Sequence, residues 1–276
     1  MEFNISQVAF KIANIDIYYY SICIILGIIL SLILCVISKE KFEIKFDDLI
    51  EIFTFSLLGG IIGARFYYCF FNLKFYMQNP GKILAFRDGG LAIYGGIILG
   101  IIVSFIISKI KKINFKDLLD YIAPYLALTQ SIGRLGNFYN IEAYGKETTF
   151  FLRMGIYKNG NFLEVHPCFI YEGLACFFIF IILRILQKKR KFKLQIFSTY
   201  MILYGCARFF IEGLRVDSLY FGSIKVSQFV SIVFIIVGSF VQFKGYIQAT
   251  YNLNTFSNNK LIQKQKKSKF VNRNTE

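Results

Sequence analysis

The chain is poor in the residues from which proteins build metal sites and disulfide frameworks. It has 1 histidine, His166, and 6 cysteines, none of which forms a Cys-x-x-Cys pair. Most of these cysteines fall inside apolar runs, where cysteine behaves as a small hydrophobic residue. We therefore expect no metal site, no disulfide framework and no cofactor, and we expect His166 to be a structural or interfacial residue.

Other features are missing as well. Residues 1–14 lack the basic segment of a cleavable signal peptide, and no small-residue cleavage pattern follows the first apolar run, 17–37. We therefore expect this run to remain in the protein as a membrane span.

Proline is rare, with 3 residues against 32 phenylalanines. No internal repeat is visible in the sequence, which disfavours a transporter built from two related halves.

The chain has long apolar runs instead. Hydrophobic residues make up 55% of its 276 positions, and globular domains of this length do not carry so many such runs. A helix needs about 20 apolar residues to cross the ~30 Å hydrocarbon core of a bilayer. Seven segments approach that length: 17–37, 49–71, 91–107, 118–133, 169–186, 194–211 and 226–243. The sequence thus predicts an all-α polytopic membrane protein with about seven transmembrane helices.

The formal net charge of +15 is distributed in a way that argues against nucleic-acid binding. Lysine and arginine gather between alternate apolar runs, at 39–45, 109–116 and 188–193, and in the C-terminal tail. Cytoplasmic loops of membrane proteins carry such an excess. We expect the N-terminus outside, the C-terminus in the cytoplasm, a transmembrane domain over 1–245 and a basic, disordered cytoplasmic tail over 246–276.

The long external stretch after the fourth segment predicts a small cap over 146–165. Its Lys-Asn-Gly-Asn at 158–161 is typical of a hairpin turn, and it separates two short apolar stretches, 150–157 and 162–165. We expect these stretches to pair as strands outside the membrane.

Polar side chains on six different helices fall at one depth in this topology. At a rise of about 1.5 Å per residue, three arginines lie roughly 21–24 Å above the inner boundary. A glutamate and two tyrosines lie roughly 5–8 Å below the outer boundary, in the same layer. The residues are Arg65, Arg134, Arg208, Glu172, Tyr20 and Tyr94, with Glu142 and Glu212 slightly above them.

Each of these residues has a simpler explanation when it is taken alone. Arg65 can extend to the interface, Tyr20 can belong to an aromatic belt, and Glu172 can pair with an arginine to hold helices together. Charges at this depth cost about 2.5–3.5 kcal/mol each even on the mildest scale. Their convergence favours a buried polar cavity for an anionic ligand. Arginine suits phosphate because its planar fork binds two oxygens.

Glycines cluster on the second and third apolar segments, at 59, 60 and 63 and at 95, 96 and 100. They either let two helices approach closely or break the helices near the cavity. The sequence leaves both explanations open.

The run Gly-Arg-Leu-Gly-Asn-Phe-Tyr-Asn-Ile-Glu-Ala-Tyr-Gly at 133–145 resembles the signature of the prolipoprotein diacylglyceryl transferase family. Other motifs follow in the family's order: the pair Tyr19-Tyr20 and the runs 63–68, 89–96, 166–172 and 204–215. Together these motifs extend the resemblance over most of the chain.

The resemblance implies an enzyme that transfers the diacylglyceryl group of phosphatidylglycerol to the lipobox cysteine of prolipoproteins. A thioether forms and glycerol phosphate is released, in the first step of bacterial lipoprotein maturation. We expect a multi-pass monomer of the bacterial cytoplasmic membrane with its active site facing the outer leaflet. Its expected partners are phosphatidylglycerol and prolipoprotein signal peptides, with no nucleic acid.

The chemistry of this transfer suggests roles for residues of the motifs. Arg134 and Arg208 are expected to bind the phosphate and stabilise it as a leaving group, and nearby positive charge also lowers the pKa of an attacking thiol. Asn137 and Asn140 are expected to donate amide hydrogens to the glycerol headgroup or the phosphate.

Glu142 and Glu212 are candidates for accepting a proton or for holding the arginines in position. Gly145 is expected to permit a tight turn close to the substrate. The expected substrate-binding set is completed by Tyr20, Arg65 and Glu172.

The chain departs from the family pattern at two positions. Many family members carry a histidine where this chain has Tyr94, and a glycine where it has Ser21. A free tyrosine, with a pKa of about 10, is a poor base at neutral pH. Tyr94 is therefore a catalytic candidate that orients the phosphate or lipid by hydrogen bonding, and the identity of the base stays open.

Two other classes of protein compete with this interpretation. An anion transporter or channel would use the same arginines, but it predicts polar residues that continue into the cytoplasmic half. There the first, third and seventh apolar segments are almost purely apolar, which disfavours a path through the protein. The second class, a non-catalytic lipid-binding protein, is not excluded by the motif spacing.

Overall fold

The structure is a computed structural model and describes residues 6–13, 15–38, 42, 44–86, 89–158 and 161–273. Within these residues the backbone is mostly helical, with three two-stranded antiparallel sheets. The chain forms two compact units. The large unit comprises Met1–Lys39 and Leu119–Glu276, and the small unit comprises Glu40–Leu118.

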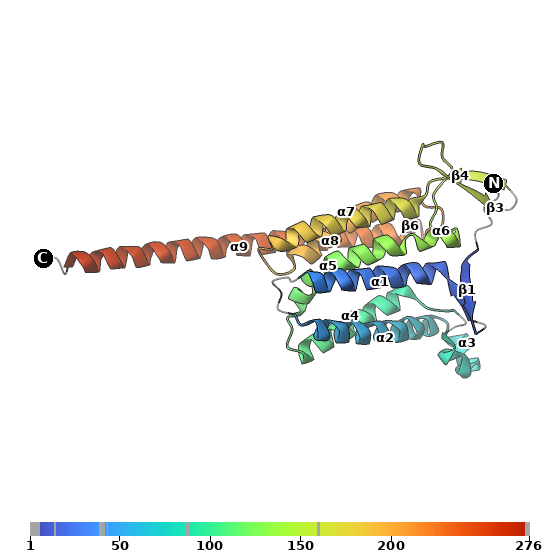
Figure 1. Ribbon diagram of the computed structural model, residues 1–276, viewed down its shortest axis with the longest axis horizontal. Helices are drawn as coiled ribbons and strands as arrows, with labels where there is room; N and C mark the ends of the chain where they lie inside the picture. The colour runs from blue at the N-terminus through green and yellow to red at the C-terminus, as the bar shows by residue number, and fades with distance from the viewer. Residues whose placement is uncertain are drawn as a thin grey trace. The chain divides into compact units, whose positions relative to one another are not determined.

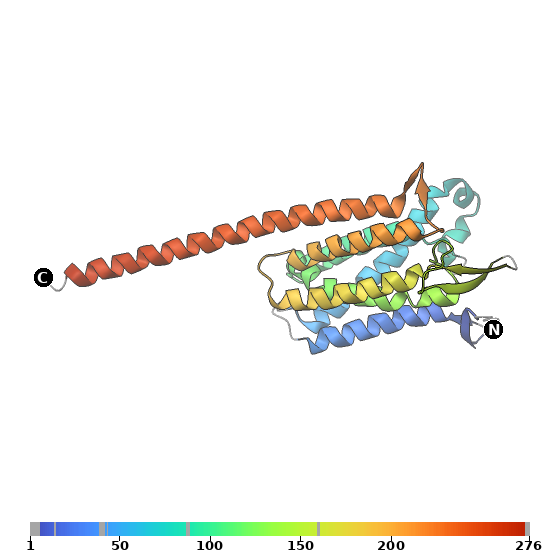
Figure 2. The same ribbon diagram turned by 90° about the horizontal axis from the view of Figure 1, so that it is seen from above.

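Long helices dominate the large unit. They are α1 (Tyr19–Ile37), α5 (Phe115–Gly133), α7 (Cys168–Lys188), α8 (Gln195–Leu214) and α9 (Val226–Arg273). They run alongside one another, and α9 continues past the ends of α7 and α8 (Figures 1 and 2). The backbone is thus helical as far as Arg273, through most of the tail that we expected to be disordered. The domain boundary at 245 stays a prediction.

The apolar core of the large unit lies between α5, α7 and α8. Ala123 and Ala127 lie one turn apart on α5 and are fully buried. Leu183 of α7 and Ile196 of α8 are fully buried in the same cluster, together with Tyr200. Because alanine has a small side chain, α7 and α8 can approach this face of α5 closely.

A buried carboxylate on α5 caps the start of α8. Asp120 Oδ1 accepts the Phe197 N–H at 2.8 Å, and Oδ2 accepts Arg190 Nε at 2.7 Å. Leu194, which precedes α8, has a left-handed φ of 68° and provides no side-chain cap. The first N–H groups of every helix lack partners within the helix, and Asp120, which lies on another helix, accepts a hydrogen bond from one of these groups.

Five helices of the described chain are long and apolar enough to cross a membrane: α1, α2 (Phe46–Phe71), α4 (Ile93–Ile110), α7 and Val226–Tyr251 of α9. Many of their large apolar side chains are exposed, as expected of helices that face lipid. The expectation of a mainly helical, polytopic membrane protein is confirmed. The other two predicted spans are the helices α5 and α8, which carry buried charged side chains.

The predicted hairpin is present between α6 (Gly136–Asn140) and α7. Strand β3 (Met154–Lys158) pairs antiparallel with β4 (Asn161–Val165). The first strand begins at Met154 rather than at 150, because the preceding residues form a loop in which Thr148 Oγ1 accepts the Phe150 N–H. Residues 159–160 of the predicted turn lie outside the described residues.

Two further hairpins were not predicted, because they lie in short segments at the ends of the apolar runs. They lead into α1 and α9, and their strands are β1 (Val8–Ile12) with β2 (Ile15–Tyr18) and β5 (Tyr220–Phe221) with β6 (Ile224–Lys225).

The small unit is built on close packing of α2 against α4, with α3 (Leu73–Gln78) and the 3-10 helix η1 (Pro80–Leu84) between them in sequence. A Cβ atom added to Gly60 would lie 3.3 Å from Gly96 O, and one added to Gly96 would lie 3.2 Å from Gly60 O. A Cβ atom on Gly63 would lie 2.5 Å from Gly95 O. At these positions glycine serves the close approach of two helices.

Candidate active site

The polar run 133–145 begins at the end of α5, contains α6 and ends in a strained turn. Ile141 and Ala143 have φ of 51° and 58°, a left-handed conformation that residues other than glycine rarely adopt. Glu142 lies between them, and its backbone N–H donates to Asn137 O at 3.2 Å. The turn therefore gives Glu142 a defined position after α6.

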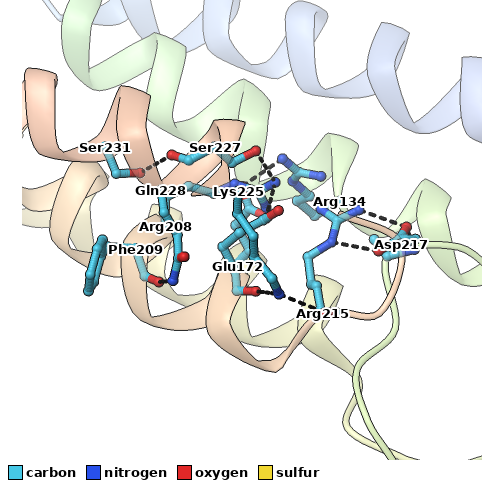
Figure 3. A network of polar contacts seen from close by, with 12 residues as sticks. Arg134, Glu172, Arg208, Phe209, Arg215, Asp217, Lys225, Ser227, Gln228 and Ser231 are labelled. Carbon is cyan, nitrogen blue, oxygen red and sulfur yellow. Dashed lines mark hydrogen bonds and ion pairs between the residues drawn. The ribbon is translucent and has the colours of Figure 1, made fainter. Parts of the chain in front are cut away.

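Glu172 of α7 joins two arginines through its two carboxylate oxygens (Figure 3). Arg134 Nη2 donates to Oε1 at 2.6 Å, and Arg208 Nη1 donates to Oε2 at 2.7 Å. The hydroxyl of Tyr204 also donates to Oε1, at 3.1 Å. Glu172 is only 1% exposed, so its charge is balanced inside the protein by these partners.

Arg208 extends this cluster to Glu212, one turn further along α8. Its Nη2 lies 2.7 Å from Glu212 Oε2 and 3.4 Å from Ser227 Oγ. Two arginines and two glutamates give the cluster a formal charge of zero. The Arg134 side chain is 26% exposed, against 13% for Arg208 and at most 2% for the glutamates. Arg134 is therefore the member of the cluster that is most accessible to a ligand.

Glu142 is held by the two asparagines that precede it. Asn137 Nδ2 donates to its Oε1 at 2.7 Å, and Asn140 Nδ2 donates to the same atom at 3.1 Å. Tyr20 approaches this region because Gly136 has no side chain: a Cβ atom there would lie 2.7 Å from the tyrosine ring.

These residues border a cavity of about 320 Å³ in the large unit. The cavity is lined by Gln7, Tyr18, Tyr20, Ser21, Asn140 and Glu142. Three of the predicted site residues, Tyr20, Asn140 and Glu142, thus come together on one cavity. Its lining contains amides, hydroxyls and one carboxylate, which are groups that bind a polyol.

Gly145 ends the polar run at a point of close packing. A Cβ atom on it would lie 2.7 Å from Cys168 Sγ, 2.8 Å from His166 Cβ and 3.0 Å from Leu214 O. Its N–H donates to His166 O at 2.7 Å, and the residue forms a β-bridge with Arg215. Glycine is therefore needed here for the loop to approach the ends of α7 and α8.

Four more polar residues of the cluster and its surroundings were not in the predicted set: Tyr204, Arg215, Asp217 and Lys225. Arg215 pairs with Asp217 through two bonds of 2.8 Å (Figure 3). Lys225 Nζ donates to Glu212 O at 2.7 Å and to Arg215 O at 3.0 Å. Tyr204 and Arg215 are the first and last residues of the motif 204–215, so the sequence already contained a signal for both residues. No sequence pattern singled out Asp217 or Lys225.

Asp217 also accepts the Ala143 N–H, through Oδ2 at 3.1 Å. Partial burial by itself would raise the pKa of this carboxyl, but the hydrogen bonds and charge of Arg215 outweigh burial. The pKa of Asp217 is therefore below its ordinary value, and the side chain is an ionised anchor for the loop that carries Glu142.

Arg65 and Tyr94 belong to the small unit. Arg65 is 2% exposed and donates to four backbone carbonyls at 2.5–3.0 Å, so it connects η1 to the two glycines that precede α4. The four acceptors are the oxygens of Lys82, Ile83, Gly89 and Gly90. Tyr94 lies in the first turn of α4 and is 38% exposed. The roles of both residues toward a substrate stay predictions.

In the part of the chain that the structure describes, no group of three or more His, Cys, Asp or Glu side chains is placed to hold a metal ion. The site consists of the arginine–glutamate cluster and the cavity beside Glu142.

A mainly helical chain with apolar, membrane-length helices and a buried cluster of charges defines a polytopic membrane protein with an internal polar site. The family model for prolipoprotein diacylglyceryl transferase matches residues 7–244. The chain belongs to this family, and the resemblance inferred from its motifs is confirmed.

Similar proteins carry the name phosphatidylglycerol–prolipoprotein diacylglyceryl transferase. That of Finegoldia magna is 46% identical over 239 residues, which cover 86% of this chain and 95% of the relative. That of Clostridium novyi is 41% identical over 259 residues, covering 91% and 99%. That of Clostridioides difficile is 43% identical over 232 residues, covering 84% and 92%.

Proposed function

We propose that this protein transfers the diacylglyceryl group of phosphatidylglycerol to the lipobox cysteine of a prolipoprotein. Support comes from the family to which the chain belongs and from the names of relatives at 41–46% identity. The structural observation that carries the proposal is the shared carboxylate of Glu172, which orients Arg134 and Arg208 toward each other.

The reaction breaks one bond and forms another at a single glyceryl carbon. The cysteine sulfur attacks the carbon that is bonded to the phosphate oxygen, and a thioether forms. The carbon–oxygen bond breaks, and its electron pair leaves with glycerol phosphate. The reaction needs a deprotonated thiol and a stabilised phosphate, and positive charge close to both groups promotes it.

Arg134 and Arg208 provide this charge in our proposal. One nitrogen of Arg134 is bound to Glu172, and in our proposal other donors of its planar guanidinium bind phosphate oxygens. Arg208 is held between Glu172 and Glu212 and stabilises the leaving group from a less exposed position. The two glutamates are thus positioning residues that keep the arginines oriented without a bound substrate.

Glu142 accepts the thiol proton in our proposal. It borders the cavity beside Tyr20, and unlike Glu212 it is held by amides rather than by an arginine. Tyr20 and Asn140, which line the cavity, donate to the glycerol headgroup in our proposal, with Asn137 as a further donor beside Glu142. Tyr94 orients the lipid by hydrogen bonding in our proposal, because a neutral phenol is a poor base.

The remaining residues of the predicted set act through the backbone. Gly145 allows the loop that carries Glu142 to lie against α7 and α8. Arg65 orders the segment before α4, which begins next to Tyr94. Each residue therefore fixes the backbone of its own unit.

We further propose seven transmembrane helices, among them α5 and α8, with the N-terminus outside and the C-terminus in the cytoplasm. The clusters of basic residues between alternate helices support this orientation. The catalytic domain then covers 1–245, the hairpin at 146–165 is an external cap, and 246–276 is a cytoplasmic tail. The protein acts as a monomer in the bacterial cytoplasmic membrane, and its site faces the outer leaflet.

The experiment that tests this function uses the purified full chain in phosphatidylglycerol vesicles with a lipobox peptide. We expect release of glycerol phosphate and a lipidated peptide cysteine, and neither product from a peptide with serine in place of that cysteine. Lipid binding without either product would instead indicate a non-catalytic lipid-binding protein. Anion flux across the vesicles without transfer would indicate a transporter.

A further inference from the structure

We propose that Asp217 is a positioning residue for the transfer reaction, acting through the loop that carries Glu142. The inference rests on the proposed function, because it assigns to Asp217 the task of fixing the proton acceptor relative to the arginines. Asp217 lies beyond the end of α8, outside every motif that the sequence offered.

The carboxylate of Asp217 connects two parts of the chain that are distant in sequence. Oδ1 accepts Arg215 Nε at 2.8 Å, and Oδ2 accepts Arg215 Nη2 at 2.8 Å. Oδ2 also accepts the backbone N–H of Ala143 at 3.1 Å, across a separation of 74 positions. A two-bond pair with arginine fixes the plane of a carboxylate, so the acceptor for Ala143 has a defined place.

The loop that receives this bond has an unfavourable backbone conformation. Ile141 and Ala143 both have positive φ, and isoleucine is β-branched, which makes this conformation especially unusual for it. Residues in such conformations persist only where their surroundings hold them. Glu142 lies between the two strained residues, so the direction of its side chain depends on the contacts that keep the turn in place.

Backbone N–H groups on both sides of Glu142 hold the turn, and next along the chain the Lys146 N–H donates to Leu214 O at 2.9 Å, at the end of α8. The Glu142 N–H donates to Asn137 O, the Ala143 N–H donates to Asp217, and the Gly145 N–H donates to His166 O. The first contact is local to the loop and the third comes from the segment before α7. The contact with Asp217 ties the turn to the end of α8, the helix that carries Arg208 and Glu212.

Asp217 therefore couples the two halves of the site. The arginine–glutamate cluster is formed by Arg134 directly after α5 and by residues of α7 and α8, whereas Glu142 and its cavity belong to the loop after α6 and to the start of α1. In our proposal, loss of the Asp217 contact leaves the bonds of Glu172 to Arg134 and Arg208 in place but loosens the turn at Ala143, while Gly145 and Lys146 keep their backbone bonds. The expected consequence is a misplaced Glu142 with normal binding of the lipid.

The first test compares Asp217→Ala and Asp217→Asn in the vesicle transfer assay with the full chain. We expect kcat to fall about 100-fold in Asp217→Ala. In Asp217→Asn, which keeps one oxygen acceptor, we expect kcat to fall about 10-fold. In both variants the KM for phosphatidylglycerol is expected to change less than about 3-fold. The matched control is Glu164→Gln, which breaks the exposed 2.7 Å pair with Arg153 and is expected to leave both constants unchanged. A kcat within about 2-fold of wild type in Asp217→Ala would overturn the proposal.

A double-mutant cycle separates positioning from loss of stability. If Asp217 acts through Glu142, Asp217→Ala adds little to the loss already caused by Glu142→Gln, whereas two independent effects multiply. Multiplying effects would overturn the proposal.

Hydrogen exchange provides a measurement that does not depend on activity. We expect faster hydrogen exchange of the backbone amides over 141–145 in Asp217→Ala and Asp217→Asn, with exchange in α5 and α7 unchanged. Unchanged exchange over 141–145 would refute the proposal that Asp217 holds this loop. If Asp217→Ala does not fold, Asp217→Asn carries the same comparison. A wild-type chain that shows no transfer refutes the proposed function, and the exchange measurement still decides whether Asp217 holds the loop.

Discussion

Arg134 and Arg208 are joined by a single carboxylate, because Glu172 binds one arginine at 2.6 Å and the other at 2.7 Å. Two guanidinium groups repel each other in a medium of low dielectric constant, so they can lie close together only with such a shared counter-ion. The arrangement leaves the Arg134 side chain 26% exposed, so that a ligand can reach it.

The first prediction concerns the planar guanidinium group of Arg134. Arg134→Lys keeps the charge, but an ammonium cannot bind Glu172 and two phosphate oxygens in the same planar arrangement. We expect kcat to fall by about 10²–10³ in the vesicle transfer assay, the usual loss when a donor to a developing negative charge is removed. Arg153→Lys in the exposed hairpin pair is the control and should retain wild-type turnover. Near-normal turnover of Arg134→Lys would contradict the role in leaving-group stabilisation.

The second prediction concerns the proton acceptor. Glu142→Gln keeps an oxygen that can accept the Asn137 and Asn140 amides but removes the negative charge. We expect kcat to fall by about 10²–10⁴, the range for loss of a general base, with little change in KM for phosphatidylglycerol. The control is Glu147→Gln, close by in sequence and outside the cavity lining. A drop below about 10-fold in Glu142→Gln would assign proton acceptance to another group.

The third prediction separates hydrogen bonding from base catalysis at Tyr94. Tyr94→Phe removes only the hydroxyl of a side chain that is 38% exposed. Loss of one neutral hydrogen bond, worth about 0.5–1.5 kcal/mol, slows the reaction by less than about 15-fold. A fall of more than about 100-fold would show instead that the phenol takes part in proton transfer. The measurement is the initial rate of glycerol phosphate release.

The fourth prediction concerns stability away from the site. Asp120→Ala removes a fully buried carboxylate and leaves Arg190 and the Phe197 N–H without its oxygens. Breaking such a buried pair costs about 3–5 kcal/mol, so we expect a clear fall in Tm in detergent. Asp48→Asn affects the partly exposed pair with Lys111 and should cost at most about 1 kcal/mol. Equal values of Tm for the two variants would disprove the capping role.

The fifth prediction tests the packing of α2 on α4. A Cβ atom at Gly63 would lie 2.5 Å from a backbone oxygen, which cannot move without shifting the helix. Gly63→Ala is therefore expected to lose about 1–3 kcal/mol by overpacking. Gly81→Ala adds a methyl group where nothing lies within 4 Å and is the control. A Gly63→Ala protein as stable as wild type would mean that α2 and α4 pack less closely than the structure shows.

Much of the fold was predictable because membrane helices follow from composition. An apolar run in lipid must satisfy its backbone N–H and C=O groups internally, so each predicted segment corresponds to a helix. The hairpins β1–β2 and β5–β6 were missed because such short strands carry too few residues for a clear periodic pattern. The polar residues of the predicted site were selected because charge inside an apolar chain is costly and therefore conspicuous.

The sequence alone was sufficient for the class of the protein, its helices and its family motifs, and it singled out Arg134, Glu172 and Arg208 as residues of a predicted polar site. Only the tertiary structure decided which charges meet. Arg134 and Glu172 are 38 positions apart, and Glu172 and Arg208 are 36 apart, so their pairing depends on how α5, α7 and α8 pack. The tertiary structure likewise revealed Asp217, because a carboxylate that binds a backbone N–H 74 positions away leaves no periodic pattern in the sequence.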